Sequence, residues 1–141
     1  MAARAVLLDT CAAIYLMEDE PIAAGARQAL YEAGERDGIF VSPVTGWEIG
    51  LLSRPDRKFP MRFAPDAATW FTRLMALEAI RNAPFTGAIG IDSALLPGVL
   101  HNDPADRMLI ATARRMGMPI MTRDRRILAY AADGHVEAIA C

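Results

Sequence analysis

Apolar residues in this chain occur in two spacings, which predict two kinds of element. Short continuous apolar runs, bounded by polar residues or glycine, are typical of strands buried in a parallel sheet. Longer stretches with apolar residues three and four positions apart are typical of helices. The expected strands are residues 5–8, 39–41, 88–91, 120–122 and 136–140. The expected helices are residues 11–17, 21–36, 43–53, 66–80, 92–96, 103–116 and 125–132.

Capping signals support two of these helices. Ser42 followed by Pro43 matches a helix N-cap with proline at the first helical position, and Asp103 followed by Pro104 repeats the pattern. Gly117 is suited to end the helix that Asp103 begins, because glycine adopts the left-handed conformation common after a helix. These signals place the boundaries of two helices more firmly than apolar spacing alone.

The alternation of short strands with helices predicts an α/β fold, a parallel sheet with helices on both faces. Residues 54–65, with three prolines and four basic side chains, are expected to form a surface loop. No repeat, low-complexity segment or linker divides the sequence. We therefore expect a single domain over residues 1–141.

Composition narrows the class of protein. A hydrophobic content of 53% is enough for a folded core, and a net charge of −2 excludes a strongly electropositive protein. The two cysteines, Cys11 and Cys141, form neither a close-spaced metal motif nor a disulfide framework, as expected for a reducing compartment. The N-terminus carries no signal-peptide pattern, and no apolar stretch reaches membrane-spanning length. These features predict a cytoplasmic protein. Basic residues gather in three stretches: Arg54, Arg57, Lys58 and Arg62; Arg114 and Arg115; Arg123, Arg125 and Arg126.

Two acidic residues stand at strand ends. Asp9 directly follows the first expected strand, and Asp124 lies two residues after Thr122, which ends another. Ligand sites in such folds form at the carboxyl ends of the strands, so both side chains are expected at one edge of the sheet. Each is also explained as the N-cap of the next helix, a common role for aspartate.

Two more acidic residues lie on apolar helix faces. Glu48 is spaced three or four positions from Val44, Leu51 and Leu52, where an unpaired glutamate is rare. A salt bridge to an arginine at the rim of the core is the structural alternative. Asp106 precedes Leu109 and Ile110 by three and four positions and should also point inward. Asp103 is better explained as the N-cap of the same helix.

Several carboxylates at one point cannot all ionise without a counter-charge. Mg²⁺ or Mn²⁺ would supply it through oxygen ligands, whereas zinc is disfavoured because histidines and cysteines do not cluster. His101 and His135 stand alone and are interpreted as surface or loop residues. Such a metal site suits metal-assisted phosphodiester hydrolysis. Trp47 and Trp70 are candidates to stack on a nucleic-acid base or to contact a partner protein. The structural alternative is that they lie in the core or in a dimer interface.

At these residues the chain resembles the PIN domain, and specifically the VapC-type ribonuclease toxins of type II toxin–antitoxin systems. The resemblance covers almost the whole sequence, and its most distinctive part is His101-Asn102-Asp103-Pro104-Ala105-Asp106-Arg107. The other segments are Leu8-Asp9-Thr10, Ser42-Pro43 through Trp47-Glu48-Ile49, Leu96-Pro97, Leu109-Ile110-Ala111 and Thr122-Arg123-Asp124. Cys11 departs from the family, which often carries a small polar residue or histidine there.

The resemblance implies a fold and a set of partners. The fold is a three-layer α/β/α sandwich around a mainly parallel sheet. The protein would be a homodimer that cleaves structured RNA such as tRNA, neutralised by a cognate VapB-like antitoxin and not itself binding DNA. Its metal, Mg²⁺ or Mn²⁺, would be held by Asp9, Glu48, Asp106 and Asp124, which are also the expected catalytic residues. Thr10 and Thr122 would hold carboxylates by hydrogen bonds.

The mechanism implied is an in-line attack on an RNA phosphodiester by a water activated at the metal, with nearby arginines on the RNA backbone. Two alternatives remain. One is a receiver-like signalling domain, in which an acidic pocket binds Mg²⁺ and an aspartate is phosphorylated. Asp9 is a single early acid rather than a pair, which counts against it. The other is a PIN-fold module that binds partners without catalysis.

Overall fold

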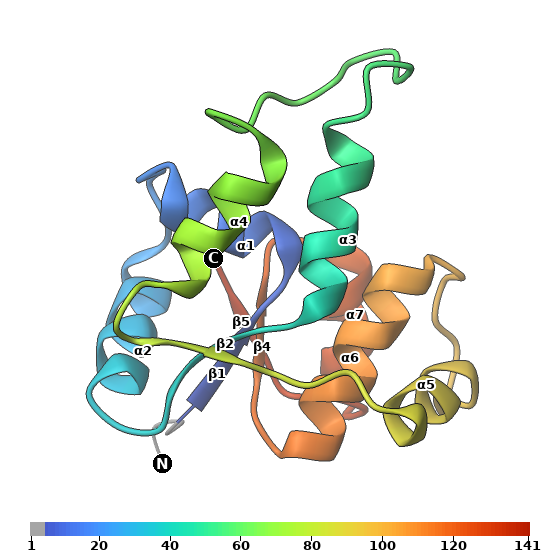
Figure 1. The fold of residues 1–141 in the computed structure, drawn as a ribbon. Helices are drawn as coiled ribbons and strands as arrows, with labels where there is room; N and C mark the ends of the chain where they lie inside the picture. The colour runs from blue at the N-terminus through green and yellow to red at the C-terminus, as the bar shows by residue number, and fades with distance from the viewer. Residues whose placement is uncertain (1–4) are drawn as a thin grey trace.

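The computed structural model describes residues 5–141. Residues 1–4, the first part of the N-terminus for which no signal peptide was expected, lie outside that range. Within it, five parallel strands form one sheet in the order β3-β2-β1-β4-β5. The strands are β1 (Ala5–Leu8), β2 (Gly38–Val41), β3 (Ile80–Asn82), β4 (Ile120–Thr122) and β5 (Ala138–Ala140). The first strand of the chain is therefore the central one (Figure 1).

Helices cover both faces of the sheet, as predicted (Figure 1). They are α1 (Thr10–Met17), α2 (Ala24–Gly34), α3 (Pro43–Leu52), α4 (Ala67–Met75), α5 (Gly87–Ala94), α6 (Pro104–Met116) and α7 (Arg125–Ala132). Alternation along β1 divides the core in two. Val6 and Leu8 pack with α1, α2 and α4, whereas Leu7 packs with α6 and α7. The predicted three-layer α/β/α sandwich is confirmed.

Two predicted elements were wrong. Residues 88–91, expected as a strand, belong to α5, whose N-cap Thr86 accepts a hydrogen bond from the backbone N–H of Ile89 at 3.2 Å. A four-residue apolar run does not distinguish a strand from a helical turn. Residues 66–80, expected as one helix, comprise α4 and then the start of β3. The sequence Ile80-Arg81-Asn82 carries no apolar run, because this edge strand buries only Ile80.

The predicted caps are confirmed. Ser42 Oγ accepts from the N–H of Val44 at 3.0 Å, and Asp103 Oδ1 accepts from the N–H of Asp106 at 2.9 Å. Gly117 ends α6 with φ of 67°. Residues 53–66 connect α3 to α4 without a helix or strand, as expected of the proline-rich segment. Across residues 5–141, no helix has the length and apolar character needed to cross a membrane.

Candidate metal centre and active site

The four predicted acidic residues lie around one pocket at the carboxyl end of the sheet. The pocket has a volume of about 290 Å³. Its lining residues are Asp9, Thr10, Cys11, Tyr15, Glu48, Asp106, Arg123 and Asp124. Asp9 and Asp124 are the N-caps of α1 and α7, Asp106 lies in the first turn of α6, and Glu48 lies in the middle of α3. Four elements that are far apart in sequence thus bring their carboxylates to the same place.

Asp9 is the most buried of the four, with 5% of its surface exposed. Its Oδ1 accepts from the N–H of Ala12 at 2.7 Å, and its Oδ2 accepts from the Thr122 hydroxyl at 2.5 Å. Burial raises the pKa of Asp9 to about 6 despite these hydrogen bonds, and repulsion from Asp106 and Asp124 adds to the effect. Asp9 is therefore both a helix cap and an acid whose ionisation is opposed by its surroundings.

Glu48 is half-buried and is held from α1. The hydroxyl of Thr10 donates to Glu48 Oε1, and it also lies 3.3 Å from the hydroxyl of Thr45. Burial raises the pKa of Glu48, and the charges of Asp106, Asp103 and Asp9 raise it further. The expectation that Thr10 and Thr122 would hold carboxylates of this group agrees with these contacts.

Asp106 has a partner that the sequence analysis missed. Its Oδ2 lies 2.6 Å from Nε2 of His101, so the interpretation of His101 as a residue standing alone was wrong. Burial nevertheless raises the pKa of Asp106, because the favourable effect of His101 is smaller. Nδ1 of His101 is buried without a hydrogen-bond partner among the described residues. The signal available in the sequence was proximity, because His101 lies only five residues before Asp106.

Asp124 differs from the other three because an arginine guanidinium forms a hydrogen bond with its carboxylate. Its Oδ1 accepts from the N–H groups of Arg126 and Ile127 at 2.8 and 3.3 Å, and its Oδ2 lies 3.1 Å from the Arg126 guanidinium. Burial would raise the pKa of Asp124, but the hydrogen bonds and charge of Arg126 hold it below its ordinary value. Arg126 also lies 3.8 Å from Asp106 Oδ2. The alternative reading of Asp124 as a helix cap is confirmed.

The pocket suits a hard cation by its donors. All four acidic residues offer oxygen ligands, as Mg²⁺ and Mn²⁺ require. Three of them carry pKa values raised first by burial and then by neighbouring carboxylates, so a bound cation would favour their ionised forms. In their present rotamers, no three acidic, histidine or cysteine side chains among residues 5–141 are close enough to share one metal ion. Thr10, His101 and Arg126 hold the oxygens instead.

The cysteine in the pocket and the two tryptophans differ in their surroundings. The pKa of Cys11 is raised to about 11, first by partial desolvation and then by the surrounding carboxylates, so its thiol stays protonated at neutral pH. Trp70 lies in the core with 4% exposed, its Nε1 donating to Glu18 at 3.0 Å. Trp47, next to Glu48, is 50% exposed. Of these two tryptophans, only Trp47 is therefore exposed enough to contact another molecule.

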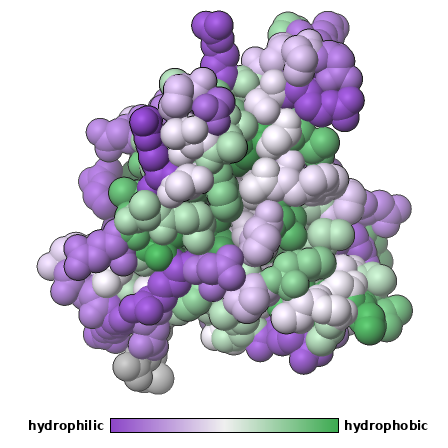
Figure 2. Space-filling model, in the orientation of Figure 1, coloured by the Kyte–Doolittle hydropathy of each residue, from purple (hydrophilic) through white to green (hydrophobic). Residues whose placement is uncertain are grey.

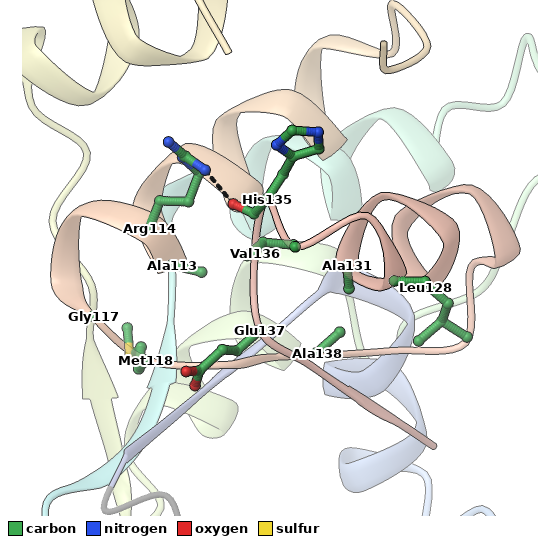
Figure 3. Close-up of a pocket in the computed structure, with 12 residues that line it drawn as sticks. Ala113, Arg114, Gly117, Met118, Leu128, Ala131, His135, Val136, Glu137 and Ala138 are labelled. Carbon is green, nitrogen blue, oxygen red and sulfur yellow. Dashed lines mark hydrogen bonds between the residues drawn. The ribbon is translucent and has the colours of Figure 1, made fainter. Parts of the chain in front are cut away.

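A larger cavity lies elsewhere among the described residues. It measures about 850 Å³ and is formed by the C-terminal parts of α6 and α7 with the segment leading into β5 (Figure 3). The guanidinium of Arg114 donates to the carbonyl oxygen of His135 at one side of it, and Glu137 is its acidic residue. None of the four predicted acidic residues lines this cavity. The predicted acidic residues are therefore gathered in the smaller pocket.

Comparison with known proteins agrees with this geometry. Residues 6–133 match the PIN domain family. The chain is 29% identical over 126 residues to Ribonuclease VapC22 of Mycobacterium tuberculosis (strain ATCC 25618 / H37Rv), covering 89% of this chain and 91% of that protein.

Two solved structures share the fold. One is VapBC2 from Rickettsia felis bound to a DNA fragment from their promoter, with a TM-score of 0.64 and 9% identity, covering 96% of this chain and 98% of that one. The other is FitAcB from Neisseria gonorrhoeae, with a TM-score of 0.55 and 18% identity, covering 95% and 96% of the two chains. Since the family match spans nearly the whole sequence, this protein belongs to the PIN domain family.

Proposed function

We propose that this protein is a metal-dependent endoribonuclease of the VapC type. The observation that carries the proposal is the group formed by Asp9, Glu48 and Asp106, three carboxylates with raised pKa values in one pocket of a PIN fold. The similarity to a VapC ribonuclease along most of the chain supports the same class. Membership of the PIN family also sets aside the receiver-like alternative.

In the proposed reaction, Asp9, Glu48 and Asp106 hold Mg²⁺ or Mn²⁺, and Asp124 supports the site. The bound ion would neutralise the carboxylates, polarise a phosphoryl oxygen and lower the pKa of water. Thr10, Thr122 and His101 orient the carboxylates by the hydrogen bonds described above. Arg126, 59% exposed beside Asp106 and Asp124, is placed to attract a phosphate. Asp124 already has this arginine as a partner, so its contribution to the metal should be the smallest of the four.

A cleavage assay tests the nuclease. The wild-type protein should cleave a structured RNA such as tRNA in Mg²⁺ or Mn²⁺ and leave it intact in EDTA. Replacing a direct ligand should cost more than the roughly 10- to 100-fold typical of outer-shell partners, so Asp9→Asn should abolish cleavage. Asp103→Asn, which keeps the helix cap, is the matched control and should retain cleavage. A fully active Asp9→Asn variant would refute the assignment, and an intact RNA with wild-type protein in Mg²⁺ would favour the binding-only PIN module.

The assembly follows from the same class. We propose a single PIN domain over residues 1–141 that forms a homodimer in the cytoplasm and is neutralised by a VapB-like antitoxin. The fold neighbours VapBC2 and FitAcB support a two-component complex. DNA contacts in such a complex are assigned to the antitoxin rather than to this chain. Co-purification with the product of an adjacent small gene, followed by loss of nuclease activity in the complex, tests the antitoxin.

A further inference from the structure

The connection between α3 and α4, residues 53–66 (the α3–α4 loop), combines positive charge with an exposed aromatic ring. It forms the uppermost part of the molecule in Figure 1. Its tip, residues 54–62, is called the crest below, and Figure 2 shows a hydrophilic patch there. Residues 54–62 contain four basic side chains and one acidic side chain, a net charge of +3. Within this segment Phe59 has 75% of its surface exposed. A charged crest carrying an exposed phenylalanine needs an explanation beyond folding.

The base of the loop is firmly attached to the core. Phe63 is 5% exposed and packs edge-on against Trp70, with ring centroids 4.9 Å apart. The N–H of Met61 donates to the carbonyl oxygen of Leu52 at 2.8 Å. Pro55 and Pro60 restrict the backbone between these attachments. The crest is therefore displayed by a fixed base, which lowers the entropy cost of ordering it on binding.

Positive charge remains available at the crest. Asp56 is committed to Arg54, whose Nη2 lies 2.7 Å from Asp56 Oδ2. Arg57 donates to the carbonyl oxygen of Leu52 at 3.3 Å, and the amine of Lys58 lies 5.5 Å from the centre of the Phe59 ring. Neither a carbonyl oxygen nor an aromatic ring neutralises a cation. The loop therefore presents two cations beside an aromatic face, a combination suited to phosphate and base together.

The loop is continuous with the acidic site through α3. A second pocket, of about 390 Å³, is lined by Glu48, Leu51 and Leu52 on α3 and by Arg54, Asp56 and Arg57 on the loop. Glu48 also lines the carboxylate pocket. A bound chain of phosphates could thus follow one surface from the crest to the acidic group. Positive charge at the crest offsets the negative charge that would otherwise repel it.

We propose that the α3–α4 loop is a docking surface for single-stranded RNA. Phe59 stacks a base, and Arg57 and Lys58 contact phosphates of the strand that enters the carboxylate pocket. This inference rests on the proposed ribonuclease function and names the part of the chain that positions its substrate. The net positive charge of the loop favours RNA, whose backbone is negatively charged, over a protein surface that has few acidic residues. Stacking on Phe59 requires unpaired bases, which structured RNAs expose in their loops.

Binding can be measured apart from cleavage in the full-length Asp9→Asn variant. Its affinity for a fluorescein-labelled single-stranded RNA of about a dozen nucleotides is followed by anisotropy. Adding Phe59→Ala should weaken binding about 5- to 150-fold, the range for loss of one stacked base, whereas Phe59→Trp should retain it. Adding Arg57→Gln and Lys58→Gln should reduce the slope of log affinity against log salt concentration by about one to two, as expected for the loss of one or two phosphate contacts.

Tyr31→Ala is the matched control, because Tyr31 is an aromatic residue on α2 with 67% of its surface exposed. It should leave RNA affinity unchanged. If the Asp9→Asn protein bound RNA equally well with and without Phe59→Ala, and the wild type cleaved RNA normally, the proposed role of the loop would be refuted while the proposed nuclease function would stand. Phe59-dependent binding by a wild-type protein that never cleaves RNA in Mg²⁺ would instead contradict the proposed nuclease. Phe59 variants that bind RNA normally but lose a co-purified antitoxin would make the loop a protein contact and overturn the inference.

Discussion

At the residue scale, the acidic group contains two electrostatic situations. The pKa values of Asp9, Glu48 and Asp106 are raised, chiefly by burial, whereas Arg126 holds the pKa of Asp124 down. The first three carry a cost that a cation would relieve, and Asp124 does not. The sequence placed all four near one another, because strand ends and helix phase are local properties. It also set Asp124 apart, because that residue stands in a run of arginines, but it could not show which arginine pairs with it, since that depends on the folded side chains.

The cost at Asp9 should appear in the pH dependence of stability. The folded state takes up a proton at a pKa of about 6 and the unfolded chain at about 3.8. Between these values the folded state binds more protons, so this group makes the free energy of unfolding fall as pH rises. In EDTA, Asp9→Asn should therefore be more stable than wild type at pH 7.5, by up to about 3 kcal/mol, and nearly equal to it near pH 4. Urea denaturation at both pH values measures this; a difference independent of pH would contradict it.

His101 should influence metal binding through Asp106. Its Nε2, 2.6 Å from Asp106 Oδ2, fixes the orientation of that carboxylate. His101→Ala should weaken Mn²⁺ affinity by about tenfold, the lower end of the range for outer-shell partners, and His101→Gln should restore part of it through an amide N–H. Calorimetric titration with Mn²⁺ gives both constants. Equal affinity in all three proteins would show that His101 only packs against the helix.

At the element scale, boundaries set by capping chemistry could be predicted, and those set by packing could not. Ser42, Asp103 and Gly117 mark their helices through local hydrogen bonds and backbone conformation. The edge strand β3 exists because it pairs with β2, a contact invisible in the sequence Ile80-Arg81-Asn82. The helix expected at residues 92–96 overlaps the end of α5, but the first part of α5 was missed because its apolar residues face two environments: Ile89 is buried, whereas Ile91 is 63% exposed.

The cap of α6 gives a prediction that separates structure from chemistry. Asp103 accepts from the N–H of Asp106, so Asp103→Ala should lower the free energy of unfolding by roughly 0.5–2 kcal/mol, whereas Asp103→Asn should cost little. Both variants should keep metal-dependent cleavage, because Asp103 lies outside the carboxylate pocket. Denaturation curves and the cleavage assay run in parallel decide this. Loss of cleavage in a folded Asp103→Asn protein would place Asp103 among the metal ligands.

At the scale of the whole molecule, one corner is conspicuously apolar. Ile91, Leu95 and Val99, on α5 and the segment after it, are 63%, 76% and 95% exposed, and Figure 2 shows the apolar patch at the lower right. Apolar patches of this kind are typical of protein interfaces. We predict that the proposed homodimer would form through this surface.

Replacing Leu95 with glutamate should therefore convert a dimer to a monomer in light scattering, because it places a charge inside the contact. Leu77→Glu is the control: Leu77 is 45% exposed after α4, and its substitution should leave the molar mass unchanged. A dimeric Leu95→Glu protein would exclude α5 as the contact.

The position of β1 at the centre of the sheet has a consequence for synthesis. Asp9 is held by Thr122, a residue 113 positions later, and β1 pairs with β4, which follows it by more than a hundred residues. The carboxylate pocket is complete only when Asp124 has joined it. A ribosome translating this message therefore carries a chain without its full acidic group until residues 120–124 have emerged. For an enzyme proposed to act on cellular RNA, the ribosome that makes it and the transfer RNAs that serve it would meet an active site only after β4 and Asp124 have been made.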